Sequence, residues 1–217
     1  MLETVVLVAV LIMSVVVHEV AHAWQARREG DDTAEQLGRI TLNPLPHLDP
    51  VGSIIIPGLL AWQGGMIFGW AKPVPVNPLR YRQYVAGDIR VSLAGIVSNL
   101  GLAALATLLS GLVVKIGSLT GGLGGVPGFL LMTLDYAIYI NLILAFFNLI
   151  PIPPLDGSHV VAHMLPRQIA DGYREIGRYG LLVVMAMIFL APGVMDLFLA
   201  PVMELRGLAD RFIRLWI

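Results

Sequence analysis

The sequence predicts an all-α polytopic membrane protein with about four to five transmembrane helices and a re-entrant or β-hairpin-like Pro/Gly-rich segment at about 51–78. Composition is the first observation behind this class, because the 217 residues are 57% hydrophobic and only 13% charged, whereas soluble domains carry about 25% charged residues. The second is that three apolar runs reach the roughly 20 residues that a spanning helix needs. The length predicts one membrane-embedded domain over residues 1–217.

Five apolar segments stand out along the chain. They cover 4–24, 51–68, 91–117, 126–150 and 180–203. The first, third and fourth are long enough to cross a bilayer. The first segment follows an acidic residue, Glu3, and contains no small-residue cleavage site, so we expect a retained helix and not a signal peptide.

The second and last segments are interrupted by proline and glycine. Segment 51–68 lies between proline-rich stretches, and we predict that it enters the membrane without crossing it. Irregular backbone at that depth is tolerated only where protein or a wet cavity covers it, so this segment is expected to line a cleft. The last segment is interrupted at 191–193 by Ala-Pro-Gly, which predicts a kinked or broken span.

Basic residues set the expected orientation, because positively charged short loops stay in the cytoplasm. Arg27 and Arg28 follow the first segment, and the stretch 69–90 carries four more basic residues. Both stretches stay inside only if 51–68 does not cross completely. We therefore expect an integral protein of the cell (inner or cytoplasmic) membrane with its site toward the cytoplasm. A net charge of −1 gives no reason to expect a nucleic-acid partner.

The stretch VVVHEVAHAW at 15–24 carries the clearest chemical signal. His18 and His22 are four residues apart, so both imidazoles lie on one face of a helix and can share one ion. Glu19 follows the first histidine, which is the position of the general base in HExxH hydrolases. Ionisable groups in a spanning helix cost roughly 2.5–3.5 kcal/mol each, so a chance occurrence is disfavoured. The chain has no cysteine, and a metal must be held by His, Asp or Glu.

Two histidines leave a catalytic zinc one protein ligand short, since such sites take three. Asp156 in NLIPIPPLDGSHV follows the fourth segment and should emerge on the same side as the HEVAH end of the first helix. Asp49 and His47 are alternative third ligands on that side. The other interpretation of Asp156 is a turn or a cap for the next helix.

A second histidine pair, His159 and His163 in HVVAH, has the same four-residue spacing. Valine stands where HExxH has glutamate, so this pair is at best a metal-binding pair without a base. We prefer to interpret the two residues as polar histidines on an interfacial helix.

Together these motifs resemble the site-2 protease family of intramembrane zinc metalloproteases, peptidase family M50. HEVAH at 18–22 and NLIPIPPLDG at 148–157 carry the resemblance. It extends to NPLPHLDPVGSIIIP at 43–57, FGWAKPVPVNP at 68–78 and AGIVSNL at 94–100, and so covers most of the chain in the family's order. No PDZ or CBS module is visible, so the expected form is the minimal core.

The resemblance implies that His18, His22 and Asp156 ligate one Zn²⁺ per chain and that Glu19 is the base. Asn99 matches an asparagine of the family pattern, which implies that it steadies the oxyanion or the substrate strand. Taken alone, the same residue would be interpreted as a helix–helix hydrogen bond.

The implied function is hydrolysis of peptide bonds in or near transmembrane segments of membrane proteins, as in regulated intramembrane proteolysis. The expected partners are a transmembrane protein substrate and the lipid bilayer. Two other classes stay open. A membrane metal transporter would distribute His and Asp along a path across the bilayer, whereas these residues gather at one end. A catalytically silent metal-binding membrane protein would not need Glu19.

Overall fold

The computed structural model describes residues 1–55, 59, 71–120 and 122–216. Every regular element in these ranges is helical, which confirms the predicted all-α class. The long helices are α1 (Leu2–Glu29), α4 (Tyr84–Thr120), α5 (Val126–Asn148) and α9 (Pro192–Arg214). The short ones are α2 (Thr33–Gln36), α6 (Gly157–Met164), α7 (Arg167–Glu175) and α8 (Gly180–Leu190), with 3-10 turns at Leu45–His47, Pro78–Arg80 and Ile176–Tyr179 and a π-helical segment at Pro50–Ile55.

Helices α1, α4 and α5 are each long and apolar enough to cross a membrane. Helices α8 and α9 add a fourth candidate only if they form one bent span, because the pair turns by 86° between Leu190 and Gly193. This confirms the predicted break in the last segment. The structure therefore has three candidate spans, or four if the bent pair counts as one. The higher number agrees with the lower end of the predicted four to five. Most of segment 51–68 lies outside the described residues, so its re-entrant or hairpin form stays a prediction.

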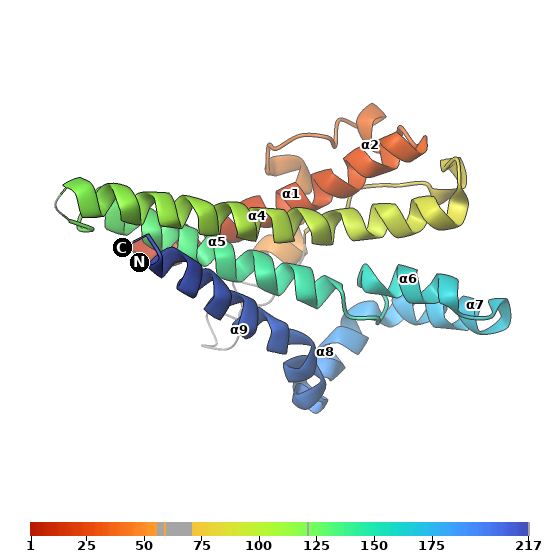
Figure 1. Ribbon diagram of the computed structural model, residues 1–217. Helices are drawn as coiled ribbons and strands as arrows, with labels where there is room; N and C mark the ends of the chain where they lie inside the picture. Colours follow the sequence, from red (N-terminus) through yellow and green to blue (C-terminus); the bar gives the residue numbers. More distant parts are fainter. Residues whose placement is uncertain (56–58, 60–70, 121, 217) are drawn as a thin grey trace.

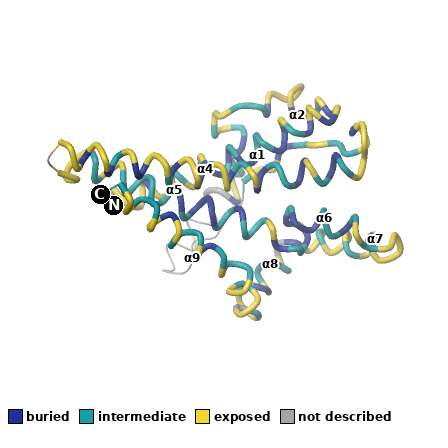
Figure 2. Tube along the Cα trace, in the orientation of Figure 1, coloured by how far each residue is buried: buried dark blue, intermediate teal, exposed yellow. Residues whose placement is uncertain are grey.

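The spanning helices lie side by side, and α4 runs antiparallel to α1 and α5 (Figure 1). Helix α9 returns along α5 and α4, which places the C-terminus near the N-terminus and at the end of the bundle that carries the α4–α5 turn. Helices α2, α6 and α7 lie at the other end. Buried residues gather where α1, α4 and α5 face one another, while their outer faces are exposed (Figure 2). A bilayer would cover those outer apolar faces.

Small side chains bring α4 close to its neighbours, as is common where helices pack in membranes. Ala103 and Ala106 of α4 pack against α5 and α9. Further along α4, a Cβ on Gly111 would lie only 2.8 Å from the Trp216 ring nitrogen, so glycine admits that ring.

One ion pair also joins α5 to α9. Arg206 Nη2 donates to both carboxylate oxygens of Asp135 at 2.9 Å, and its guanidinium lies 4.9 Å from the centre of the Tyr139 ring. Charges on helices of a membrane bundle are usually paired in this way. The pair ties α9 to the bundle.

Because the chain has no cysteine, single cysteines can report the membrane side of each end of the bundle. We expect Gly124→Cys in the α4–α5 turn and Leu215→Cys near the C-terminus to react with an impermeant maleimide from the same side. Gln36→Cys in α2 should react only from the opposite side, because the 28 residues of α1 extend about 42 Å and exceed the roughly 30 Å hydrocarbon core. Labelling of Gly124→Cys and Gln36→Cys from one side of sealed, oriented vesicles would contradict the arrangement.

Candidate metal centre

Two histidines of α1 and an aspartate that precedes α6 come together inside the bundle. His18 Nε2 and His22 Nε2 lie 3.0 Å apart, and Asp156 Oδ2 lies 3.2 Å from the first and 3.3 Å from the second. In the described part of the chain this is the one group of His, Asp or Glu side chains with spacing suited to a metal ion. The structure therefore brings together the three residues that the sequence singled out as a ligand set.

Each histidine is oriented through its other ring nitrogen. His18 Nδ1 lies 2.6 Å from the side-chain oxygen of Asn99, and His22 Nδ1 lies 2.7 Å from the backbone oxygen of Val91. Since carbonyl oxygens only accept hydrogen bonds, both Nδ1 atoms donate, and each neutral imidazole is left with a lone pair on Nε2. Metal-binding histidines usually have this second hydrogen bond.

Asp156 presents its carboxylate to the histidines and does not cap the helix that follows it. The residue occupies the N-cap position of α6, but its side chain makes no capping hydrogen bond. Its Oδ2 is buried, and within the described part of the chain it has no hydrogen-bond donor apart from the two histidine rings that face it. Burial favours the neutral acid, yet hydrogen bonds from His18 and His22, together with their charge, hold the pKa of the Asp156 carboxyl well below its ordinary value.

The donor set fits zinc. Two Nε2 lone pairs and one carboxylate oxygen face one another without a hydrogen atom between them in these tautomers, so they repel unless a cation lies among them. A triangle with sides of 3.0–3.3 Å places each atom about 2 Å from a common point, which is the length of a zinc–nitrogen or zinc–oxygen bond. Two histidines and a carboxylate also leave a fourth position for water or substrate.

Helix α4 approaches the histidines closely because residue 95 is glycine. A Cβ on Gly95 would lie 2.5 Å from both His22 Nε2 and His18 Cε1. Val91 and Asn99 stand four residues before and after it, so all three lie on one face of α4. That single face thus contacts both rings.

The hydrogen bond that His18 donates to Asn99 is the first of a chain of buried polar contacts across three helices. Asn99 Nδ2 donates to Asn141 Oδ1 of α5 at 2.7 Å, and Asn141 Nδ2 donates to Ser14 Oγ of α1 at 2.9 Å. All three side chains are buried, and Asn99 is wholly inaccessible. Sequence analysis missed Asn141 and Ser14. The signal available for Asn141 was a polar amide in the middle of an apolar helix.

Glu19 follows His18 on α1 and makes a contact of its own. Its Oε2 accepts a hydrogen bond from Val74 N at 2.7 Å, within an irregular stretch that Arg39 holds by donating to Lys72 O at 2.9 Å. The Glu19 side chain is half-buried. The carboxylate is therefore anchored through one oxygen next to the metal centre.

The alternative third ligands point elsewhere. His47 is buried, and its Nε2 lies 3.0 Å from Thr41 O. Asp49 Oδ1 accepts from the backbone N–H groups of Val51 and Gly52. Neither residue belongs to the metal-compatible group.

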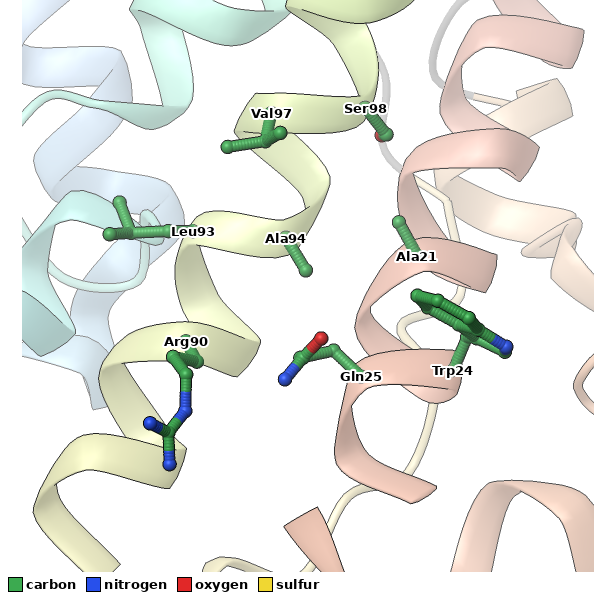
Figure 3. Close-up of a pocket in the computed structure, with 8 residues that line it drawn as sticks. All are labelled: Ala21, Trp24, Gln25, Arg90, Leu93, Ala94, Val97 and Ser98. Atoms are coloured by element: carbon green, nitrogen blue, oxygen red, sulfur yellow. The ribbon is translucent and has the colours of Figure 1, made fainter. Parts of the chain in front are cut away.

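A groove of about 520 Å³ lies between α1 and α4 (Figure 3). Its lining comprises Ala21, Trp24, Gln25, Arg90, Leu93, Ala94, Val97 and Ser98. Among the described residues, Glu19 and the three clustered residues are not part of this lining.

Comparison with known proteins finds relatives of one kind. The sequence model of Peptidase family M50 matches residues 126–191. YwhC of Bacillus subtilis is 39% identical over 188 residues, which cover 86% of this chain and 80% of the relative. Rip2 of Mycolicibacterium smegmatis is 33% identical over 182 residues, 82% of this chain and 64% of the relative. Both names describe inferred zinc metalloproteases. No solved structure matches the chain significantly.

Gly95→Ala tests the close approach of α4. The added methyl group would overlap the histidine rings, and we expect it to weaken zinc binding by at least about tenfold, the size of effect seen when the groups that orient metal ligands are lost. Zinc content and affinity of the purified protein in detergent measure this. Gly101→Ala is the matched control, because no atom of the described residues, apart from the local backbone of its own helix, lies within 4 Å of an added Cβ, and it should bind zinc normally. Unchanged affinity in Gly95→Ala would contradict the geometry.

Proposed function

The chain belongs to peptidase family M50 and is a zinc metalloprotease of that family, and we propose that it hydrolyses peptide bonds in or near the transmembrane segments of other membrane proteins. The observation that carries this proposal is the location of the site. His18 and His22 lie within α1, a helix long and apolar enough to span the membrane. A peptide bond that reaches them must come from a segment that also enters the membrane.

In this proposal His18, His22 and Asp156 hold one Zn²⁺ per chain. When bound, the zinc supplies a Lewis acid that polarises the scissile carbonyl and lowers the pKa of the attacking water. Glu19 accepts a proton from that water and delivers it to the leaving amine nitrogen, so the proton lost in attack is returned on cleavage. The hydrogen bond from Val74 N to Oε2 orients the Glu19 carboxylate for both transfers.

Asn99 is proposed to act on the site through His18. Its amide oxygen faces His18 Nδ1, and its amide nitrogen donates to Asn141 and to Ser14 O. Because the side chain is wholly buried, these contacts support a role in fixing the tautomer and orientation of the ring. A role in steadying the oxyanion or the substrate strand stays a prediction.

Charge supports a cytoplasmic position for the end of the bundle where α2 and α6 lie. Arg27 and Arg28 lie in the last turn of α1. Arg82 lies just before α4, and Arg90 lies near its start. Basic residues flanking spans favour the cytoplasm. The metal centre lies in the half of α1 nearest that end.

The ligand arrangement gives no support to metal transport. Transport would call for several ligand groups along a path across the bilayer. The described residues contain one metal-compatible group, and it is joined to a carboxylate in the position of a hydrolytic base.

Glu19→Gln tests the proposed chemistry. The amide cannot accept the proton from water, so cleavage should fall by at least about 100-fold while zinc content stays that of the wild type. The measurement uses purified protein in detergent and a panel of single-span membrane proteins, with a zinc chelator as the inactive reference.

Glu35→Gln is the matched control, because Glu35 lies on α2 and pairs with Arg27 at 2.8 Å. It should cleave normally. Full proteolysis by Glu19→Gln would remove the assigned base, whereas loss of zinc from that variant would assign Glu19 a structural role.

Asn99→Ala separates the two roles of that residue. If Asn99 orients His18, its loss should weaken zinc binding by about 10- to 100-fold. Asn148→Ala is the control, since Asn148 Nδ2 donates to Leu144 O within its own helix. Unchanged zinc affinity with a large loss of kcat would instead favour the oxyanion role.

A further inference from the structure

The second histidine pair binds a buried carboxylate. Asp88 of α4 is only 7% exposed, and its Oδ2 lies 2.7 Å from His163 Nε2 and 3.2 Å from His159 Nδ1. The two histidines face it together because they stand four residues apart on α6. We call this group of three residues the Asp88 clasp.

The clasp is held by hydrogen bonds and charge. It is not among the groups of described residues whose atoms are spaced for a metal ion. The hydrogen bond to Asp88 raises the pKa of His159, which favours the charged form and strengthens the pair. His163 is 6% exposed, so most of its contact with Asp88 is shielded from water.

The clasp holds the helix that begins at the metal centre. Helix α6 starts at Gly157, directly after Asp156. The two histidines of the clasp stand in the first and second turns of this helix. At the start of α6, a Cβ on Gly157 would overlap the carbonyl oxygen of Leu149, so α6 is pressed against the end of α5. A helix fixed at both places leaves the Asp156 carboxylate little freedom to move.

The face of α4 that contacts the rings also carries the clasp. Asp88, Val91, Gly95 and Asn99 follow one another at intervals of three or four residues, so they lie on one side of the helix. This side contacts His22 and His18 directly, and it reaches Asp156 through α6. A single helix, α4, therefore fixes the positions of all three side chains of the centre relative to one another.

We propose that Asp88 is a positioning residue that holds α6, through His159 and His163, so that Asp156 stays at the His18–His22 pair. This inference rests on the proposed role of Asp156 as a metal ligand. It predicts that removing the clasp weakens zinc binding specifically through Asp156.

The test is a double-mutant cycle on zinc affinity. The zinc dissociation constants of the full chain and of the Asp88→Asn, Asp156→Ala and doubly substituted variants are measured in detergent by competition with a chromogenic chelator. Asp88→Asn should raise the constant about tenfold, as loss of outer support does. In the Asp156→Ala background the same change should add nothing, because residues that act through one another are not additive.

Two further variants separate positioning from general stability. Asp135→Asn makes the same chemical change in the α5–α9 ion pair, which does not involve α6, and it should leave zinc affinity unchanged. His163→Gln keeps an N–H donor toward Asp88 and should retain most of the affinity, whereas His163→Leu should lose it. This pair also serves if Asp88→Asn does not fold.

An equal effect of Asp88→Asn with and without Asp156 would overturn the proposal, as would an equal effect of Asp135→Asn. Loss of a second zinc equivalent in Asp88→Asn would identify the clasp as a metal site instead. If Asp156→Ala weakens zinc binding and Asp88→Asn does not, the positioning role of Asp88 is rejected, while the ligand role of Asp156 stands. If Asp156→Ala binds zinc like the wild type, the proposed ligand role fails.

Discussion

Three hydrogen-bond acceptors, on His18, His22 and Asp156, face one another in the interior of this bundle. The surrounding structure depends on this close approach. Two imidazole lone pairs and the Asp156 carboxylate lie within 3.3 Å of one another, and in a low-dielectric interior such groups repel strongly without a cation. The tautomers that produce this arrangement are set by carbonyl oxygens behind the rings. A divalent metal would remove the repulsion, and the relatives of the chain are named as zinc metalloproteases.

Helix α4 organises the centre although it supplies none of the three clustered side chains. Its glycine admits the rings, its backbone and Asn99 accept from them, and Asp88 holds α6. Each of these groups is polar or small in a segment that is otherwise apolar, and a polar group without a partner would be costly there. The polar chain from His18 to Asn141 is satisfied at every step, which gives it one arrangement and makes the ring position rigid.

The site and the rest of the bundle are held by different kinds of contact. Away from the metal centre, α4, α5 and α9 pack through alanine, aliphatic and aromatic side chains, and the Asp135–Arg206 ion pair is a separate contact. Glu19 accepts from Val74 N, in a different stretch of the chain from the groups that hold the histidine rings. Glu19 and the two histidines are thus carried by one helix but supported by different neighbours.

The sequence by itself determined the all-helical membrane class, the long helices and the pairing of His18 with His22, because apolar length and helical spacing are local properties. It also indicated Asp156, through a proline-rich motif and the side of the membrane on which that motif should emerge. Only the tertiary structure decided that His47 and Asp49 turn away, that Val91 and Asn99 orient the rings, and that His159 and His163 bind Asp88. The contacts of the four histidines join residues 69 to 81 positions apart, and a backbone carbonyl or a close glycine leaves no periodic signal in the chain.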